Sequence, residues 1–487
     1  MSVKVRDTLS GERVEVGGEG GVGLYVCGPT VYNHIHIGNV RAPLFWDVVA
    51  RYLRSRGYAV TFVQNVTDVE DKIIAKANEE GVSWDEIVSR YTESFHERLG
   101  LMGVGLPDIE PRATEHIPEM ILLIEDLIED GHAYAPGEAN GDVYYSVESY
   151  PEYGRLSRQR ADDMRETEKG QTGYKRSALD FALWKASKPG EPAWESPWGP
   201  GRPGWHIECS AMVEKHLPGG ADIHGGGVDL LFPHHENELA QSAGAHPDRT
   251  FVRAWAHHGM VNFIGDKMSK SVGNILDAKE AVELHGRNAV RMWFLQSHYS
   301  QPIDYSGEIL EERRRSFKRL LRLYQQISGS KRSSDLSDDL AAKVRERFDA
   351  AMDDDFDTSG AIAAVFEAAR RAGREVSARP EAAREFASLG DALEEILSIF
   401  GFELPEEHIE HTEGVRVRRE VPVAAAVGTS TRLETLKVPK EVGQRVRFRE
   451  EARQKKDWAT ADRLRDELRA EGWSVEDTPQ GPILSRV

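Results

Sequence analysis

The spacing of apolar residues predicts a parallel β-sheet in the first part of the chain. Residues 23–27 form a short β-favouring run, and residues 43–56 carry apolar side chains at helical spacing. Gly57 is a typical helix end, and residues 58–63 are again typical of a strand. A strand, a helix and a strand within about forty residues form a βαβ unit, whose two strands are parallel.

Further along the chain, helical and strand-like segments alternate. Helical spacing predicts three more helices, over 71–78, 84–101 and 116–130. Residues 131–203 are instead rich in aromatic residues, glycine and proline, and we interpret them as an insertion. Strand signals return at 221–224 and 251–258, so the sheet is expected to continue after the insertion.

The last third of the chain is predicted to be mainly helical. Residues 306–400 have an almost purely helical pattern that begins with the basic stretch 313–319. Residues 404–439 show little periodicity and suggest a linker or a small mixed element. From Glu441 we expect an Arg/Lys-rich helix and then a strand at 473–475. That helix is expected to carry four apolar residues on or near one face: Ala452, Trp458, Ala461 and Leu464.

These patterns predict an α/β protein. We expect a Rossmann-type parallel-sheet domain with an insertion, then a helical bundle and a small C-terminal region. The five parts are expected at 1–130, 131–203, 204–305, 306–403 and 404–487. The first and third parts would be the two halves of the sheet domain.

Composition limits the class of protein. Of 487 residues, 40% are hydrophobic and 29% are charged, which is typical of a soluble globular protein. No apolar run reaches the roughly eighteen residues of a membrane span, and the opening MSVKVRDTLS lacks the apolar core of a signal peptide. The only two cysteines, Cys27 and Cys209, exclude a disulfide framework and indicate a reducing cytoplasm. A net charge of −19 argues against nucleic-acid binding by the whole surface.

The segment that follows the first predicted strand has the features of an anion site. His36, Gly38 and Asn39 lie at or just before the start of the first helix, where free N–H groups and the helix dipole favour a phosphate. Gly38 lets a ligand approach the backbone, and Asn39 could cap the helix. A turn histidine beside an ordinary capping asparagine is the alternative.

A second segment, KMSKSVGN, places two lysines three residues apart. Lys267 and Lys270 stand among small hydroxyl and glycine residues, which suits a cationic loop that binds a triphosphate. A solvated surface loop is the alternative.

The two cysteines belong to a third cluster. Pro233 suits the first turn of a helix, so His234 and Glu238 are expected four residues apart on one face. This imidazole and carboxylate, with the thiolates of Cys27 and Cys209 from distant loops, could form a tetrahedral zinc site. The alternative is that each cysteine is a small buried apolar residue and that the glutamate faces solvent.

The first two segments, HIGN and KMSKS, resemble the HIGH and KMSKS signatures of the class I aminoacyl-tRNA synthetases. They occur in the order of that family, with one sheet domain between them. Asn39 replaces the last histidine of the signature, and an amide can donate a hydrogen bond but carries no charge. The resemblance implies that His36, Asn39, Lys267 and Lys270 are catalytic and bind ATP.

Longer strings are very similar to the cysteinyl-tRNA synthetases. They are YVCGPTVYNHIHIGN, NVTDVEDKII, LPDIEPRATEHI, PGWHIECSAM, DIHGGGVDLLFPHHENELAQ and KMSKSVGN, and the match continues in AMDDDFDTSGAIAAVFE, KKDWATADRLRDEL and EDTPQGP. Since these strings cover most of the chain, the resemblance implies the family's whole activity. Cysteine would be activated with ATP to an adenylate and transferred to the 3′ end of tRNA(Cys).

The same resemblance assigns the site residues. It implies a zinc ion held by Cys27, Cys209, His234 and Glu238, which the substrate thiolate then joins. It implies a substrate pocket of Thr67, Trp205, His206, His224 and His235. ATP, bound with Mg²⁺, would also contact Gly38 and Asp229. The helical bundle would contact the tRNA stem and the C-terminal region its anticodon, in a protein expected to be a cytoplasmic monomer with no membrane contact.

Zinc chemistry explains such a site. Cysteine and serine differ by one atom, and an ordinary pocket separates such a pair only modestly. Zinc takes a thiolate far more readily than a neutral hydroxyl and lowers the pKa of the thiol as it binds. Neutral histidines around the metal could accept the released proton.

Two other functions are compatible with parts of this pattern. The cysteine ligase of mycothiol biosynthesis resembles the zinc and ATP sites but joins cysteine to an amino sugar. A zinc-stabilised RNA-binding paralogue would have no activation chemistry. The helical stem and the tail after residue 306 argue against the first, and intact His36, Lys267 and Lys270 argue against the second.

Overall fold

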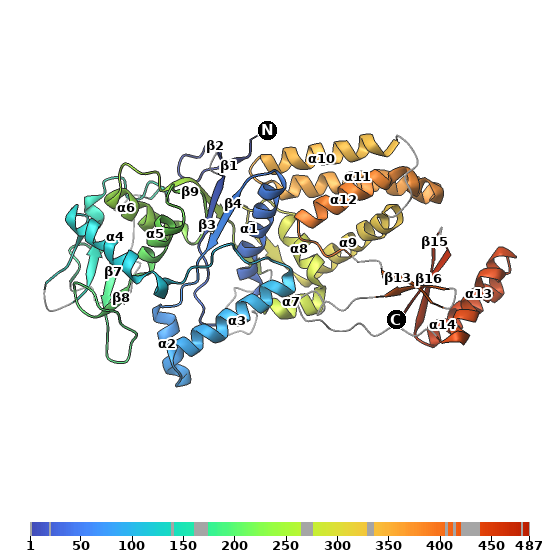
Figure 1. Cartoon of the computed structure of the whole chain (residues 1–487), viewed down its shortest axis with the longest axis horizontal. Coiled ribbons are helices and arrows are strands. Elements are labelled where there is room, and N and C mark those ends of the chain that lie inside the picture. Colours follow the sequence, from blue (N-terminus) through green and yellow to red (C-terminus); the bar gives the residue numbers. More distant parts are fainter. Residues whose placement is uncertain are drawn as a thin grey trace. The chain divides into compact units, whose positions relative to one another are not determined.

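The computed structural model describes most of the chain (Figure 1). The described residues are 2–18, 21–137, 141–159, 174–263, 276–328, 336–404, 408–412, 415–419, 439–478 and 481–486. They form two compact units. The first is Met1–Arg371 with Phe386–Glu403, and the second is Ala372–Glu385 with Leu404–Val487. The five-part division predicted from the sequence stays a prediction.

A four-stranded parallel sheet lies at the centre of the first unit. Its order is β10 (Val252–His258), β9 (Ala221–Gly227), β3 (Val22–Val26), β4 (Val60–Gln64). The chain runs outward from β3 to β4 in one direction and from β9 to β10 in the other. The order therefore reverses between β3 and β9, and ligands of such sheets bind at the carboxyl ends of the strands beside this point.

Helix α1 (Ile37–Ser55) connects β3 to β4 and begins six residues before the predicted start at residue 43. His36 is its N-cap residue, so the prediction that Asn39 caps the helix is wrong. The side-chain oxygen of Asn39 accepts the His36 backbone N–H at 3.1 Å, which ties the third helical residue back to the cap. Pro43 consequently lies inside the helix, where it removes one backbone hydrogen bond.

Close packing fixes α1 against the sheet. Trp46 is fully buried on α1, and a Cβ atom on Gly225 of β9 would lie only 2.4 Å from its ring. Only glycine allows this approach of helix to strand.

The helices that follow the first βαβ unit are confirmed. They are α2 (Asp71–Glu80), α3 (Trp84–Met102) and α4 (Ile117–Glu129). The segment predicted to be an insertion contains an antiparallel sheet of β5 (Ala133–Tyr134), β6 (Val143–Tyr145), β7 (Phe181–Ala186) and β8 (Gly201–Pro203), in that order. Its buried aromatic side chains pack against α4, which explains the aromatic composition of this segment.

The second half of the sheet domain and the helical part complete the first unit. Its elements are α5 (Trp205–His216), α6 (Glu236–Ala245), β11 (Val261–Phe263), α7 (Ala278–His285), α8 (Arg287–Leu295), β12 (Ile303–Tyr305), α9 (Gly307–Ile327), α10 (Leu336–Asp353), α12 (Ala387–Ile399) and α11 (Thr358–Ala378) as far as Arg371. Strands β1 (Lys4–Arg6) and β2 (Arg13–Glu15) form a hairpin at the N-terminus.

A buried arginine joins several of these helices. Arg291 on α8 is fully buried, and its guanidinium donates to the carbonyl oxygens of Met102 at 2.9 Å and Phe400 at 2.8 and 2.6 Å. It thus connects the C-terminal ends of α3 and α12 to α8.

The second unit contains a small sheet and two helices. The sheet order is β13 (His408–Thr412), β14 (Val415–Arg419), β16 (Gly481–Arg486), β15 (Trp473–Thr478), and the helices are α13 (Lys440–Gln454) and α14 (Trp458–Ala470). The prediction of one continuous helix here is wrong. Lys456 has a φ of +59°, which breaks the helix, and Asp457 caps α14 by accepting the Thr460 N–H at 3.1 Å. Trp458 is consequently 57% exposed rather than part of an apolar face.

The fold class predicted from the sequence is confirmed. None of the helices in the described ranges is both long enough and apolar enough to cross a membrane.

The central strand should dominate the stability of the first unit. Leu24 of β3 is fully buried and pairs with strands on both sides. We expect Leu24→Ala to cost about 2–5 kcal/mol of folding free energy, because it leaves a cavity in the core. Thermal unfolding followed by circular dichroism measures this. The matched control, Leu122→Ala on α4, removes a side chain that is 60% exposed and should change stability by less than about 0.5 kcal/mol. Equal losses in the two variants would contradict this account of the core.

Candidate active site

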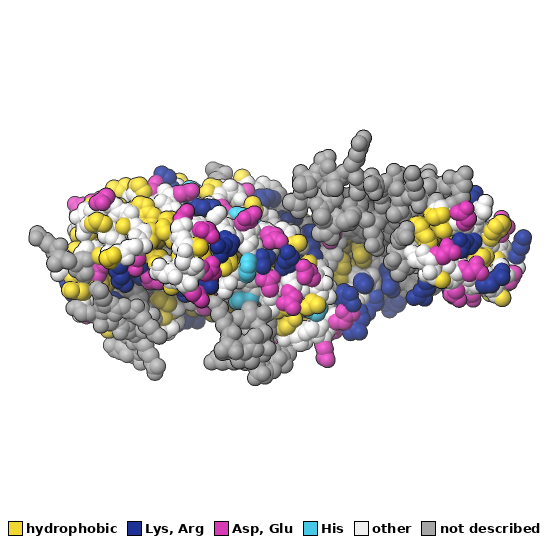
Figure 2. Space-filling model, turned by 90° about the horizontal axis from the view of Figure 1, so that it is seen from below, with side chains coloured by type: hydrophobic (Ala, Val, Ile, Leu, Met, Phe, Trp, Pro, Cys, Tyr) yellow, Lys and Arg dark blue, Asp and Glu magenta, His cyan; other side chains and the backbone are white. Residues whose placement is uncertain are grey.

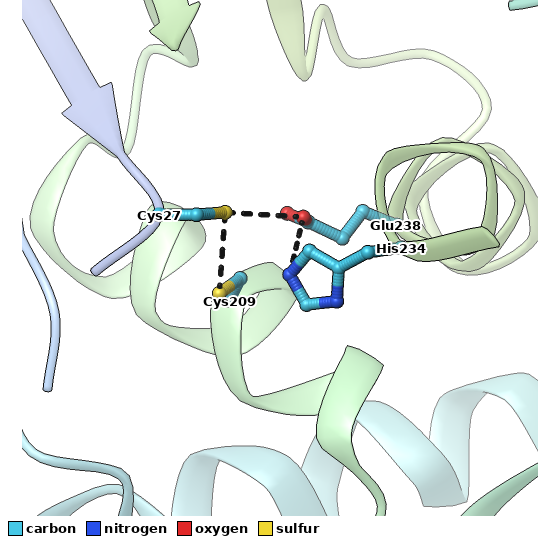
Figure 3. Close-up of side chains that lie close together, drawn as sticks. All are labelled: Cys27, Cys209, His234 and Glu238. Carbon is cyan, nitrogen blue, oxygen red and sulfur yellow. Dashed lines mark hydrogen bonds and ion pairs between the residues drawn. The ribbon is translucent and has the colours of Figure 1, made fainter. Parts of the chain in front are cut away.

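Four potential metal ligands converge at the carboxyl ends of β3 and β9 (Figure 3). Cys27 follows β3 directly, Cys209 lies on α5, and His234 and Glu238 lie four residues apart around the start of α6. Cys27 Sγ is 3.7 Å from Cys209 Sγ and 3.6 Å from Glu238 Oε1. His234 Nε2 is 3.1 Å from Glu238 Oε1. The structure thus brings together the four residues that the sequence suggested as zinc ligands.

The distances between these atoms suit a tetrahedral zinc ion. Ordinary zinc bond lengths predict ligand–ligand separations of about 3.8 Å for two sulfurs, about 3.6 Å for sulfur and oxygen, and about 3.4 Å for nitrogen and oxygen. The observed separations are 3.7, 3.6 and 3.1 Å. The donors therefore need little rearrangement to bind the ion.

Burial makes this cluster dependent on a positive charge. Glu238 is fully buried, and its Oε2 atom has no hydrogen-bond partner among the described residues. Burial, and then the neighbouring Cys209, hold the pKa of Glu238 well above its usual range, and burial likewise raises the pKa of Cys27. Burial lowers the pKa of His234 and keeps it neutral. A divalent cation would reverse the penalty on the thiolates and the carboxylate.

A second set of donors overlaps the first. His224 Nε2 and His235 Nε2 lie 3.4 and 3.3 Å from Cys27 Sγ, and His224 Nε2 is 3.7 Å from Glu238 Oε2. Cys27, His224, His235 and Glu238 could therefore also surround an ion. The first set provides two thiolates and the second only one, and zinc prefers thiolate ligands.

Neighbouring side chains fix the orientation of His234. Its Nδ1 atom lies 3.0 Å from Nδ1 of His206, and Trp205 stacks on its ring with centroids 4.3 Å apart. Burial lowers the pKa of His206 to about 3, so this ring is neutral and can accept a hydrogen bond from His234. Such a bond leaves Nε2 of His234 free to bind a metal.

A hydrogen-bonded chain fixes His235. The Thr8 hydroxyl donates to the Trp255 carbonyl oxygen at 2.9 Å, which leaves the Thr8 oxygen to accept from His257 Nδ1 at 2.8 Å. Nε2 of neutral His257 then accepts from His235 Nδ1, also at 2.8 Å. His235 Nε2 is consequently a hydrogen-bond acceptor directed toward Cys27.

Two members of this hydrogen-bonded chain, His257 and Thr8, were missed by the sequence analysis. A signal for His257 was present, because it stands beside His258 at the carboxyl end of the strand predicted at 251–258. Burial lowers the pKa of His257 to about 4. Thr8 carried no signal, because it lies 249 residues from His257 in the sequence.

Thr67 lies on the other side of the cluster. Its hydroxyl donates to Glu208 Oε2 at 2.9 Å, and Glu208 is fully buried, another residue that the sequence analysis missed. Asn65 Oδ1 accepts the Gly28 N–H at 2.9 Å and lies 3.8 Å from Cys209 Sγ. A Cβ atom on Gly28 would lie 1.5 Å from the Asn65 carbonyl oxygen, so only glycine fits after Cys27.

The expected nucleotide residues occupy the same edge of the sheet. His36 and Gly38 are half-buried at the start of α1, and a Cβ atom on Gly38 would lie 3.0 Å from the His36 ring. Asn39 is exposed, and Asp229 is exposed just after β9. The other two predicted ATP ligands, Lys267 and Lys270, lie outside the described residues.

Comparison with known proteins identifies the family. The family model described as the class I (C) tRNA synthetase catalytic domain matches residues 13–315, a DALR domain model matches 347–404, and a cysteinyl-tRNA ligase anticodon binding domain model matches 437–481. The cysteine–tRNA ligase of Rubrobacter xylanophilus is 68% identical over 487 residues and covers 100% of both chains. The cysteine–tRNA ligase of Methylobacillus flagellatus is 45% identical and covers 96% of this chain and 95% of that one.

The chain belongs to the cysteinyl-tRNA synthetase family. The resemblance inferred from the sequence is confirmed, and so is the activity of a cysteine–tRNA ligase, with cysteine, ATP and a tRNA as partners. The anticodon-binding match and the full-length relatives decide against the amino-sugar ligase and the non-catalytic paralogue.

Solved synthetase structures share the fold of this cysteinyl-tRNA synthetase. A methionyl-tRNA synthetase of Mycobacterium tuberculosis in complex with methionyl-adenylate aligns with a TM-score of 0.59 at 18% identity. The alignment covers 78% of this chain and 89% of that one. LeuRS of Agrobacterium radiobacter K84 aligns with a TM-score of 0.58 at 12% identity, over 78% and 84% of the two chains.

The two overlapping donor sets make different predictions. We expect Cys209→Ser to remove the bound zinc after dialysis, because it replaces a thiolate of the first set. His224→Ala should lower the affinity for zinc by only about 10- to 100-fold, as expected for a residue that only surrounds the ligands. Elemental analysis of the purified variants measures the metal content. Full zinc in the Cys209 variant together with its loss from the His224 variant would assign the ion to the second set.

Proposed function

We propose that Cys27, Cys209, His234 and Glu238 hold one zinc ion through which this synthetase selects cysteine. The observation that carries the proposal is the convergence of these four donors within 4.8 Å of one another, with three of their separations close to those around a tetrahedral zinc ion. A bound zinc ion takes a thiolate far more readily than the neutral hydroxyl of serine and lowers the pKa of the thiol.

The surrounding residues shape the pocket for the substrate. Trp205 and His206 orient His234, as their contacts indicate. His224 and His235 face Cys27, and Thr67 lies beside the helix that carries Cys209. Nε2 of His235 can accept a hydrogen bond from the substrate thiol, because the hydrogen-bonded chain through His257 leaves a lone pair on that atom and burial lowers the pKa of His235, so that the ring is neutral.

ATP binds at the start of α1. His36, Gly38 and Asn39 contact its phosphates, Asp229 contacts the ribose or the adenine, and Mg²⁺ accompanies the nucleotide. The oxygen of the Asn39 amide accepts from the His36 backbone N–H, so its NH₂ group is the part that can donate to a phosphate. Lys267 and Lys270 supply positive charge to the developing phosphate negativity.

The chemistry of activation needs positioning more than acid–base catalysis. The carboxylate of cysteine attacks the α-phosphorus in line, with pyrophosphate as the leaving group, and it is already ionised. We therefore assign no general base to this step. The substrates meet where the order of the sheet reverses, with the thiol pocket beside Cys27 and the phosphates beside His36.

The tRNA, which we propose is tRNA(Cys), contacts a basic face of α9. Four exposed residues at helical spacing form this face: Arg315, Lys318, Arg319 and Arg322. Figure 2 shows lysine and arginine side chains gathered in this part of the first unit. Positive charge concentrated here is compatible with the net charge of −19, since phosphate contacts require only a local basic surface. A monomeric state and a cytoplasmic location stay predictions.

Amino-acid activation tests the proposal. In ATP–pyrophosphate exchange we expect cysteine to support turnover and serine to support almost none. Cys209→Ser should raise the cysteine concentration required, because a thiolate that binds the metal is removed.

Lys270→Ala should slow adenylate formation far more than it weakens tRNA binding, because lysine stabilises phosphate charge. An unchanged adenylate burst in this variant would remove Lys270 from the mechanism. For Cys209→Ser, unaltered cysteine activation together with retained zinc would refute the metal assignment.

The basic face of α9 predicts that variants there weaken tRNA binding but keep amino-acid activation. We expect the double variant Arg315→Glu with Arg319→Glu to raise the tRNA KM and to leave cysteine-dependent exchange unchanged. The slope of log affinity against log salt should fall by about 2, because each arginine that no longer neutralises a phosphate lowers it by about 1. Arg90→Glu on α3, where the arginine pairs with Glu80 and Glu86, is the control and should leave the tRNA KM unchanged. An unaltered salt slope in the double variant would exclude these arginines from the tRNA interface.

A further inference from the structure

Arg41 in the second turn of α1 makes an unusual set of contacts. It is only 2% exposed, and its guanidinium donates to four backbone carbonyl oxygens: Gly259 at 2.5 Å, Met260 at 3.2 Å, Tyr299 at 3.0 Å and Gln301 at 2.6 Å. Within the described chain no carboxylate pairs with it, and burial lowers the pKa of Arg41 to about 10. The four hydrogen bonds of its two terminal nitrogens thus all go to main-chain atoms.

The four carbonyl groups belong to two segments that meet at one junction. Gly259 and Met260 connect β10 to β11, whereas Tyr299 and Gln301 precede β12. The two segments are also bonded to each other, because the Gly259 N–H donates to the Tyr299 oxygen at 2.9 Å. A Cβ atom on Gly259 would lie 2.4 Å from the Gln301 carbonyl carbon, so the junction has no room for a side chain there.

The same part of α1 also lies close to β11. A Cβ atom on Gly38 would lie 3.7 Å from Cβ of Val261, the first residue of β11. The Arg41 bonds to Gly259 and Met260, the two residues just before β11, hold this strand close to the start of α1. In the sequence, β11 is followed by the segment that contains Lys267 and Lys270.

The chain after that segment returns to the same place. The Ile37 N–H donates to the Leu276 carbonyl oxygen at 3.0 Å, and the Ala278 N–H donates to the Ile35 oxygen at 3.2 Å. His36 therefore lies in a short β-bridge opposite Asp277. Residues 35–41 consequently contact the described residues on both sides of 264–275.

We propose that Arg41 is a positioning residue for the ATP-dependent step: it fixes β11 against the start of α1 and so sets the separation between His36 and the strand that leads to the second signature. This inference rests on the proposed role of the two signatures in ATP binding. An arginine is required because its planar fork of five N–H donors can span two segments, which a lysine ammonium cannot do.

A matched arginine elsewhere separates positioning from general stability. Arg291 is also buried and also donates to backbone carbonyl groups, those of Met102 and Phe400, although unlike Arg41 it lies 3.6 Å from a carboxylate, Asp47 in the third turn of α1. None of these groups belongs to the start of α1 or to β11. Arg291→Lys should therefore reproduce the loss of stability of Arg41→Lys without its effect on ATP.

The test compares Arg41→Lys and Arg291→Lys in ATP–pyrophosphate exchange, thermal unfolding and zinc content. We expect Arg41→Lys to lower kcat by up to about 100-fold and to raise the ATP KM, because small displacements of reacting groups cost that much. Its cysteine KM and its zinc content should stay unchanged. Arg291→Lys should melt at a similarly reduced temperature with normal kinetic constants. Gly259→Ala displaces the same junction but retains Arg41, and it should give the same ATP defect. This variant replaces Arg41→Lys in the test if Arg41→Lys does not fold.

Three outcomes would overturn the inference. The first is a folded Arg41→Lys enzyme with unchanged kcat and ATP KM. The second is that Arg41→Lys and Arg291→Lys lose exchange activity equally, to the extent that each lowers the melting temperature. Lys270→Ala is measured in parallel. If that variant is inactive while Arg41→Lys is normal, only the role of Arg41 is wrong. If Lys270→Ala is fully active, the ATP assignment fails and the inference with it.

Discussion

The burial of acidic donors without a compensating cation is the constraint on which this site depends. Cys27, Cys209 and Glu238 lie together at the edge of the sheet, and the ion-pairing neighbours of Glu238 within the described chain are histidines that burial keeps neutral. Forming the anions there costs several kcal/mol per charge unless an opposite charge is present. The raised pKa values keep Glu238 and Cys27 protonated in the absence of a cation, and their ionised forms become favourable only beside a positive charge, which would link ionisation of the site to metal binding.

The parallel sheet explains how distant residues meet. The carboxyl ends of parallel strands lie at one edge of the sheet, so Cys27 after β3, Thr67 after β4 and His257 at the end of β10 lie along the same edge. The reversal of strand order between β3 and β9 leaves room there for the pocket and for the start of α1. The proposed sites for the amino acid and for the nucleotide thus both lie at a single topological feature, and the buried side chains of Arg41 and Arg291 connect the surrounding loops and helices.

Local patterns predicted much of this, and long-range contacts account for what was missed. The strands and most helices follow from apolar spacing, and a four-residue separation predicts that His234 and Glu238 share a face. The start of α1 at Ile37 was missed because Pro43 suggested a later beginning, and a tail helix was predicted across Lys456, whose left-handed backbone no apolar pattern reveals. Glu208 stood in a recognisable string, but only its contact with Thr67 gives it a place in the site.

The bond from Thr8 to His257 has a consequence for the start of the chain. The first residues of most domains are the least constrained, and they tolerate fusions and trimming. Here Asp7 is buried and accepts the Trp255 N–H at 2.9 Å, and Thr8 ends the chain of hydrogen bonds that reaches His235. Residues 7 and 8 thus support the two histidines that lie behind Cys27, and a change at Thr8 alters the hydrogen bonds that orient the His235 ring.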